Sequence, residues 1–402
     1  MCRFICLALL LLVGFQSKAQ YKNDNILYKN VYPEDLGHQL KANPGYLLLD
    51  VRSKGENEDT SSMASVNIGH LKNAKNIDVR QLGARLNELQ DFKNSPVFVY
   101  CSHSQRSRRA SKMLADSGFT HVFNINGGLT TLLQTNSDLN DIYETRDNYQ
   151  LISPAEFCSA INSKNIFVLD VRSDSSYEAI TTDEEVNAMG KLKPAVHVPF
   201  ASLENSLSKI PKDKKIIIAD EYGDESIKAA ILLNSKGYKN AGVLFNGLYN
   251  LINTNSADVN CKMAVWEQNK KYHILPPDEF NELARQNKDI AIIDIRSSLD
   301  YNNQSKDYWR NSGHIKNAVN IPADELQTRI DNVSSFKNKP VIIYTFGSSG
   351  EAYKAAATLV ANGFNNVNIL SGGIFNLRWR AANIKGKSML KDWVTDIPAD
   401  NQ

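Results

Sequence analysis

The chain repeats one pattern of motifs three times, and this repeat constrains its fold more than any other feature. In each copy an apolar run ends in Asp-x-Arg and is followed by a Gly-x-x-Lys-x-Ala segment, a second apolar run, a helical pattern and a glycine turn. A period of about 120 residues is too long for a solenoid and predicts separate domains in tandem. The copies open with LLLDVR at 47–52, FVLDVR at 167–172 and AIIDIR at 291–296.

The alternation of strand and helix patterns predicts the fold class. The second apolar runs, at 96–101, 215–220 and 340–345, are rich in β-branched residues and are typical of buried parallel strands. Strands that alternate with helices favour an α/β domain, so we expect each domain to be a mostly parallel sheet with helices on both faces. The expected domains are 27–147, 149–261 and 272–385, with a polar linker over 262–272.

The first nineteen residues are typical of a signal peptide. Arg3 precedes an apolar run from Phe4 to Phe15, and the small residues Ser17 and Ala19 favour cleavage after Ala19. The run is shorter than the roughly twenty residues that span a bilayer, and an uncleaved anchor is the alternative. We therefore expect an exported protein, periplasmic or secreted, with no membrane span after cleavage.

The charge balance argues against nucleic acid as a partner. The chain has 46 Lys and Arg against 44 Asp and Glu, a net charge of +2, and both excess cations, Arg3 and Lys18, lie in the expected signal peptide. A mature chain with balanced charge lacks the basic surface that binds polyanions.

Three cysteines remain after residue 19, namely Cys101, Cys158 and Cys261. Their number and spacing fit neither a disulfide framework nor a zinc site. Cys158 and Cys261 flank the second domain and pairing is open, but we favour two incidental thiols. An odd number of cysteines leaves at least one thiol unpaired in an oxidising compartment, and a thiol kept free there suggests a chemical role.

Cys101 is the strongest candidate nucleophile. It ends the apolar run PVFVYC and is followed by the polar loop SHSQRS and a helical pattern. Ligands of open parallel sheets bind at the carboxyl ends of strands. Loop amides, the positive end of a helix and the nearby Arg106 all favour a thiolate there.

Together these motifs resemble the rhodanese family of sulfurtransferases over nearly the whole mature chain. The resemblance implies that Cys101 is catalytic and alternates between thiolate and persulfide, without a cofactor or metal. Implied substrates are a small donor such as thiosulfate or a persulfide, and a thiol, cyanide or protein acceptor. The residues that would bind the sulfur and its donor are Ser102, His103, Ser104, Gln105 and Arg106.

The loop favours sulfur transfer over phosphate hydrolysis. Phosphatases of this fold have the longer loop Cys-x5-Arg, whereas this chain has Cys-x4-Arg. Ser104 stands where the family often has glycine, so we expect a less regular amide cradle. His103 is expected to be a solvent-facing loop residue, with an acid–base or donor-binding role as the alternative.

The second and third copies lack the nucleophile. In the second copy, Asp220 takes the place of Cys101 and Glu225 that of Arg106. In the third copy, Thr345 and Glu351 take these places, and the loop between them is one residue longer. The acidic loop lacks the spacing of a calcium site, so we expect no metal. We expect one active site per chain, with the degenerate domains shaping access to it or binding a protein partner.

Other polar motifs are expected to hold the fold. Asp50 and Arg52 belong to the Asp-x-Arg pairs that remain in the copies without cysteine, which favours a structural role. All four tryptophans lie beyond residue 265, where packing within and between domains is expected: Trp266, Trp309, Trp379 and Trp393.

Two alternatives to a sulfurtransferase remain open. The first is a non-catalytic binding or scaffold protein built on the same domains. The second is a thiol redox sensor, which needs Cys158 or Cys261 as an internal partner for Cys101.

Overall fold

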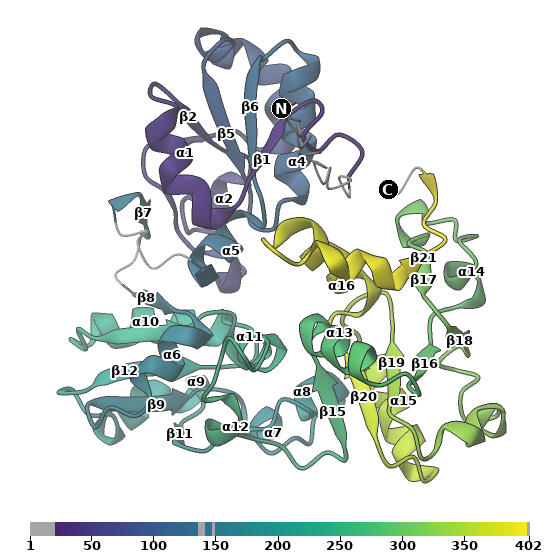
Figure 1. Cartoon of the computed structure of the whole chain (residues 1–402). Coiled ribbons are helices and arrows are strands. Elements are labelled where there is room, and N and C mark those ends of the chain that lie inside the picture. Colours follow the sequence, from purple (N-terminus) through teal and green to yellow (C-terminus); the bar gives the residue numbers. More distant parts are fainter. Residues whose placement is uncertain (1–20, 136–140, 147–148, 400–402) are drawn as a thin grey trace, which may run out of the picture.

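The computed structural model describes residues 21–135, 141–146 and 149–399, so the expected signal peptide lies outside the described residues. Within them, the chain forms three α/β domains, each built on a five-stranded sheet whose neighbouring strands are all parallel (Figure 1). Each sheet has an apolar cluster on either face, covered by helices. The predicted fold class is confirmed.

Domain 1 has the strand order β1-β6-β5-β2-β4. Its strands are β1 (Lys29–Val31), β2 (Leu47–Asp50), β4 (Lys75–Asn76), β5 (Pro96–Tyr100) and β6 (His121–Ile125), with a small antiparallel pair of β3 (His70–Leu71) and β7 (Tyr143–Glu144). Its helices are α1 (Leu36–Ala42), α2 (Lys54–Asn57), α3 (Val79–Leu82), α4 (Gln105–Asp116) and α5 (Gly128–Thr135), with 3-10 turns η1 (Pro33–Asp35), η2 (Ala64–Val66) and η3 (Gly83–Phe92).

Domain 2 has the equivalent order β8-β13-β12-β9-β11. Its strands are β8 (Gln150–Ile152), β9 (Ile166–Asp170), β11 (Ala195–His197), β12 (Lys215–Ala219) and β13 (Ala241–Leu244), with β10 (Lys191–Leu192) paired to β14 (Trp266–Glu267). Its helices are α6 (Pro154–Ala160), α7 (Asp174–Tyr177), α8 (Glu184–Asn187), α9 (Phe200–Leu203), α10 (Asp224–Ser235), α11 (Gly247–Asn253) and α12 (Lys262–Val265), with η5 (Glu204–Lys209).

Domain 3 repeats the order as β15-β20-β19-β16-β18. Its strands are β15 (Tyr272–Leu275), β16 (Ala291–Asp294), β18 (Ala318–Asn320), β19 (Val341–Tyr344) and β20 (Val367–Leu370), with β17 (His314–Ile315) paired to β21 (Val394–Thr395). Its helices are α13 (Pro277–Gln286), α14 (Ser298–Tyr301), α15 (Gly350–Ala361) and α16 (Gly373–Asn383), with η6 (Tyr308–Arg310), η7 (Ile330–Phe336) and η8 (Ser388–Trp393).

The start of the segment 262–272 is not a linker. Residues 262–265 form α12, and the following strand β14 pairs with β10 of domain 2. The Trp266 indole also donates to the Met189 carbonyl at 2.6 Å. These contacts attach the segment to domain 2. The strands β10 and β14 are about 75 residues apart in the sequence, so the polar composition of the segment does not indicate that they pair.

The three domains pack against one another. Ala64 of domain 1 lies in an apolar cluster of domain 2, and Ala188 of domain 2 lies in one of domain 3. Helix α16 of domain 3 lies beside domain 1 (Figure 1), and its Asn383 accepts a hydrogen bond from Arg108 of α4. Among the described residues, no helix combines the length and apolar character needed to cross a membrane.

Candidate active site

Cys101 follows the central strand β5 directly. Side chains alternate between the two faces of a strand, so Val97, Val99 and Cys101 join one apolar cluster while Phe98 and Tyr100 join the other. Cys101 is 1% exposed, and its Sγ lies 3.7 Å from the hydroxyl oxygen of a serine on α4, Ser107. The strand pattern therefore buries the thiol at the carboxyl edge of the sheet, beside the start of α4.

The loop after Cys101 turns through a left-handed residue, Ser104, with φ 78° and ψ −21°. We expected serine at this place to make the loop less regular, yet Ser104 adopts the conformation that glycine favours. Its hydroxyl accepts a hydrogen bond from Asn124 Nδ2 at 3.2 Å, and the side chain is fully buried. This polar contact helps to offset the cost of a positive φ in a residue with a Cβ.

A glycine turn clamps the loop from the other side. The amides of Leu129 and Thr130, at the start of α5, donate to the carbonyls of Cys101 and Ser102 at 2.8 and 3.1 Å. Gly128 has φ 63°, and a Cβ there would clash with the Cys101 carbonyl oxygen. Only glycine permits this close approach.

Arg106 lies at the loop as expected, but it already holds a partner. Its guanidinium donates two hydrogen bonds of 2.7 Å to Glu56 and one of 2.9 Å to the Ser102 hydroxyl. Burial disfavours the charged form of Glu56, but hydrogen bonds from Arg106 and Ser53 outweigh it and lower the pKa of Glu56 to about 2. The pair is therefore ionised at physiological pH, and the Arg106 side chain is 35% exposed.

Glu56 was missed by the sequence analysis. The pattern Ser53-x-x-Glu56 is a capping box, and in the structure both of its hydrogen bonds are present at the start of α2. That signal locates a helix start, but it does not indicate pairing with Arg106, fifty residues away.

The His103 side chain is exposed, as expected, and it lines an open pocket of about 500 Å³ where the three domains meet. The surrounding protein, and then the charge of Arg106, lower the pKa of His103. Its carbonyl oxygen accepts a hydrogen bond from the indole of Trp379 in domain 3 at 3.0 Å. Gln105 lines the same cavity.

The same clamp identifies the equivalent positions in the other domains. Leu248 N donates to the Asp220 carbonyl at 2.8 Å, and Ile374 N donates to the Thr345 carbonyl at 3.1 Å. Helix α10 begins four residues after Asp220, as α4 does after Cys101, whereas α15 begins five after Thr345. The predicted alignment, including the extra loop residue in domain 3, is confirmed.

In domain 2 the Asp220 carboxylate fills its own loop. It accepts hydrogen bonds from the amides of Gly223, Glu225 and Ser226 at 2.6, 2.7 and 3.1 Å, and from the Ser226 hydroxyl at 3.0 Å. Burial raises the pKa of Asp220, although these hydrogen bonds oppose the shift. Gly223 holds the left-handed turn with φ 98°, as Ser104 does in domain 1. The loop amides therefore point at the side chain of the strand-end residue.

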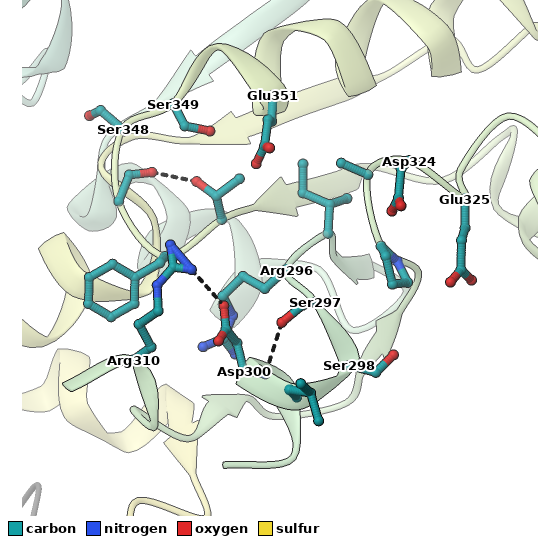
Figure 2. A pocket seen from close by; sticks show the side chains of 17 residues that line it. Arg296, Ser297, Ser298, Asp300, Arg310, Asp324, Glu325, Ser348, Ser349 and Glu351 are labelled. Atoms are coloured by element: carbon teal, nitrogen blue, oxygen red, sulfur yellow. Dashed lines mark hydrogen bonds and ion pairs between the residues drawn. The ribbon is translucent and has the colours of Figure 1, made fainter. Parts of the chain in front are cut away.

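In domain 3 the corresponding site is an open pocket of about 730 Å³ (Figure 2). Glu351 lies in its wall, and Arg310 pairs with Asp300 at 3.1 Å. Thr345, at the position equivalent to Cys101, has a hydroxyl group in place of a thiol. Neither domain 2 nor domain 3 has a cysteine in its loop.

The Asp-x-Arg pairs are buried hydrogen-bonded units. Arg52 donates through Nε and Nη2 to the Asp50 carboxylate, with a shortest distance of 2.7 Å, and Nη2 also donates to the Gly69 carbonyl at 2.7 Å. Asp50 and Arg52 are both fully buried. The same geometry recurs in Asp170–Arg172 and Asp294–Arg296. These pairs hold the strand ends in all three domains, and Arg296 also lines the domain 3 pocket (Figure 2).

The preference for incidental thiols at Cys158 and Cys261 was wrong. The two residues form a disulfide with Cα atoms 5.2 Å apart, joining α6 to the residue that precedes α12. The two cysteines are 103 residues apart, so no local sequence pattern indicates that they lie together. Among the described residues, Cys101 is left as the free cysteine.

A model of the rhodanese-like domain matches the chain at residues 33–134, 153–253 and 276–378. The chain belongs to the rhodanese-like family. This membership supports a sulfurtransferase-type role.

Curated relatives match one domain at a time. The chain is 40% identical over 81 residues to "Uncharacterized protein YqhL" of Bacillus subtilis, covering 20% of the chain and 56% of the relative. It is 34% identical over 107 residues to the tRNA uridine(34) hydroxylase of Wigglesworthia glossinidia brevipalpis, covering 25% of the chain and 30% of the relative. The chain thus spans about a third to just over half of these relatives.

Solved structures include other rhodanese-like proteins. A thiosulfate sulfurtransferase from Pseudomonas aeruginosa is 16% identical, with a TM-score of 0.24 over 85% of this chain and 66% of that one. A rhodanese from E. coli is 29% identical, with a TM-score of 0.19 over 22% of this chain and 91% of that one.

Proposed function

We propose that the chain is an exported sulfurtransferase that moves a sulfane sulfur through a persulfide on Cys101. One observation carries the proposal: the domain 2 loop binds a carboxylate with three amides and a hydroxyl at the place where domain 1 has Cys101. The two loops have the same length and the same left-handed turn. The amides of Ser104, Arg106 and Ser107 correspond to the three donors and are suited to stabilise an anionic sulfur.

The chemistry balances without a cofactor. The Cys101 thiolate attacks the outer sulfur of thiosulfate, the S–S bond of the donor breaks, and sulfite leaves with the bonding electrons. Cys101 then carries a persulfide whose terminal sulfur is anionic and accepts hydrogen bonds from the loop. A thiolate, cyanide or protein acceptor attacks that sulfur and returns the electron pair to Cys101.

Arg106 would orient the anionic donor through the N–H groups that Glu56 and Ser102 leave unused. A guanidinium has five N–H donors, and three hydrogen bonds are made to these two residues. Because Glu56 fixes the guanidinium from one side, the donor is oriented on the other. The surrounding protein and the charge of Arg106 lower the pKa of His103, which favours the neutral ring beside the Arg106 guanidinium.

Two features support export. The first nineteen residues have the composition of a cleaved signal peptide, and the Cys158–Cys261 disulfide is typical of an oxidising compartment. N-terminal sequencing of the protein from the periplasm or medium tests cleavage after Ala19, and recovery of the uncleaved chain from the cytoplasm would contradict it.

The central test is the intact mass of residues 20–402 after incubation with thiosulfate, beside the Cys101→Ser variant. We expect one added sulfur atom on the wild type, its absence from the variant, and its removal by cyanide. If Cys101 gains no sulfur from thiosulfate or from a low-molecular-weight persulfide, the sulfurtransferase proposal is wrong.

The disulfide also bears on the redox alternative. A sensor would need a thiol to resolve an oxidised Cys101, and the two candidates named from sequence are bonded to each other. The scaffold alternative predicts that Cys101→Ser leaves every cellular property of the protein intact.

A further inference from the structure

The active-site loop of domain 1 is held in part by domain 3. The Trp379 indole N–H, on helix α16, donates to the His103 carbonyl at 3.0 Å. Asn383, at the end of the same helix, is fully buried and accepts hydrogen bonds from Arg108 Nη1 at 2.7 Å and from Gly127 N at 3.2 Å. Helix α16 therefore contacts the loop, the helix that follows it and the glycine turn that clamps it.

The contact with His103 determines where the next amide points. In a trans peptide the carbonyl of one residue and the N–H of the next point in opposite directions. Because Trp379 holds the His103 carbonyl outward, the Ser104 N–H is directed toward the inside of the loop. In domain 2 the amide of the equivalent residue, Gly223, donates to the strand-end carboxylate at 2.6 Å.

Domain 1 needs such support more than domain 2 does. Ser104 and Gly223 share the left-handed turn, with φ 78° and 98°, but only the serine has a Cβ that makes this conformation costly. A peptide held in a costly conformation persists only where its surroundings fix it. The Trp379 hydrogen bond fixes this one from outside the domain.

We propose that Trp379 of the degenerate third domain is a positioning residue for the domain 1 site: it holds the His103–Ser104 peptide so that the Ser104 amide faces the sulfur of Cys101. The inference rests on the proposed function and names what domain 3 supplies to it. Trp379 does not touch the reacting atoms. It acts through the orientation of one loop peptide.

The test compares Trp379→Phe with the wild type in two assays on residues 20–402. Phenylalanine keeps an aromatic ring and removes the N–H donor. We expect the rate of sulfur loading from thiosulfate to fall about tenfold, the equivalent of one hydrogen bond. We also expect the pH midpoint of Cys101 alkylation by iodoacetamide to move upward by about one unit, with the melting temperature little changed.

A second variant separates positioning from packing. Glycine at position 104 adopts the left-handed turn without help, so Ser104→Gly added to Trp379→Phe should restore most of the loading rate and the alkylation profile. The matched control is Trp393→Phe, which removes an indole N–H bonded to Asn281 at 2.9 Å within domain 3. It should leave both assays unchanged.

The outcomes distinguish the two proposals. Alkylation does not depend on sulfur uptake, so it tests positioning even if the wild type takes no sulfur, a result that would overturn only the proposed function. The role of Trp379 is overturned if its phenylalanine variant alkylates with the wild-type pH profile. It is also overturned if Trp393→Phe causes an equal loss, or if Ser104→Gly restores nothing.

Discussion

The contact between domains 2 and 3 should weaken as the pH rises, because of one buried carboxyl group. Glu185 on α8 is 9% exposed, and the Tyr353 hydroxyl of α15 lies 3.4 Å from its Oε1. Burial, and then the negative charge of Asp183, raise the pKa of Glu185 from 4.5 to about 7, while the Tyr353 contact opposes the shift. Tyr222 and Tyr249 also face this group and are uncharged near neutral pH.

The sign follows from the raised pKa. Folding favours the protonated form of Glu185, so its contribution to stability is fully present below pH 4.5 and is lost as the pH rises through about 7. A shift of two and a half units corresponds to about 3 kcal/mol at 1.36 kcal/mol per unit. Glu185→Gln replaces the carboxyl with a neutral group of the same shape. At pH 8 it should stabilise the protein by up to about 3 kcal/mol, and at pH 4 it should change little.

Thermal unfolding of both proteins at half-unit steps from pH 4 to 8 measures this effect. The wild type should lose melting temperature relative to Glu185→Gln across that range. The matched control is Glu184→Gln, which changes the neighbouring, more exposed carboxylate that pairs with Lys270 at 3.8 Å. Parallel pH curves for the wild type and Glu185→Gln would refute the reasoning.

Three further predictions concern the loops and the disulfide. Asp220→Ala leaves the loop donors of domain 2 without their carboxylate, so we expect the free energy of unfolding to fall by about 2 kcal/mol. Millimolar sulfate should then raise the melting temperature of the variant more than that of the wild type, because the free donors can bind an anion. Equal responses to sulfate would contradict this. Gly128→Ala should abolish sulfur loading, because its Cβ would displace the Cys101 carbonyl. The control is Gly45→Ala, which has φ 75° but open space around it: its free energy of unfolding should fall by about 1 kcal/mol, and sulfur loading should be unchanged. Cys261→Ser should lower the free energy of unfolding in urea by about 2 to 4 kcal/mol and leave the rate of sulfur loading unchanged. A urea midpoint equal to that of the wild type under oxidising conditions would argue against the disulfide.

Both degenerate domains contact domain 1 near the Cys101 loop. Domain 3 contributes Trp379 and Asn383 to the surroundings of the Cys101 loop. Domain 2 contacts domain 1 through Asn250, which accepts a hydrogen bond from Gln134 of α5 at 3.0 Å. These contacts give a physical reason for keeping domains that have no thiol of their own.

Local patterns were enough to predict the fold and the place of Cys101. Strand alternation, the Asp-x-Arg turns and the glycine turns are all set within a few residues, because side-chain direction and backbone conformation are local properties. The same patterns aligned Asp220 and Thr345 with Cys101 and identified the extra residue in the third loop. Even the start of α2 is visible in the spacing of Ser53 and Glu56.

The partners of these groups were decided only by the tertiary structure. Arg106 pairs with a residue 50 positions away, Cys158 with one 103 away, and His103 with one 276 away. Such contacts depend on how elements and domains pack, and no local pattern in a single sequence encodes which distant side chain will meet which. The sequence by itself determined three parallel-sheet domains and one thiol at a strand end. Packing of the third domain against the first added the Trp379 hydrogen bond to those that domain 1 itself makes to the loop, because only the tertiary structure brings helix α16 to that place.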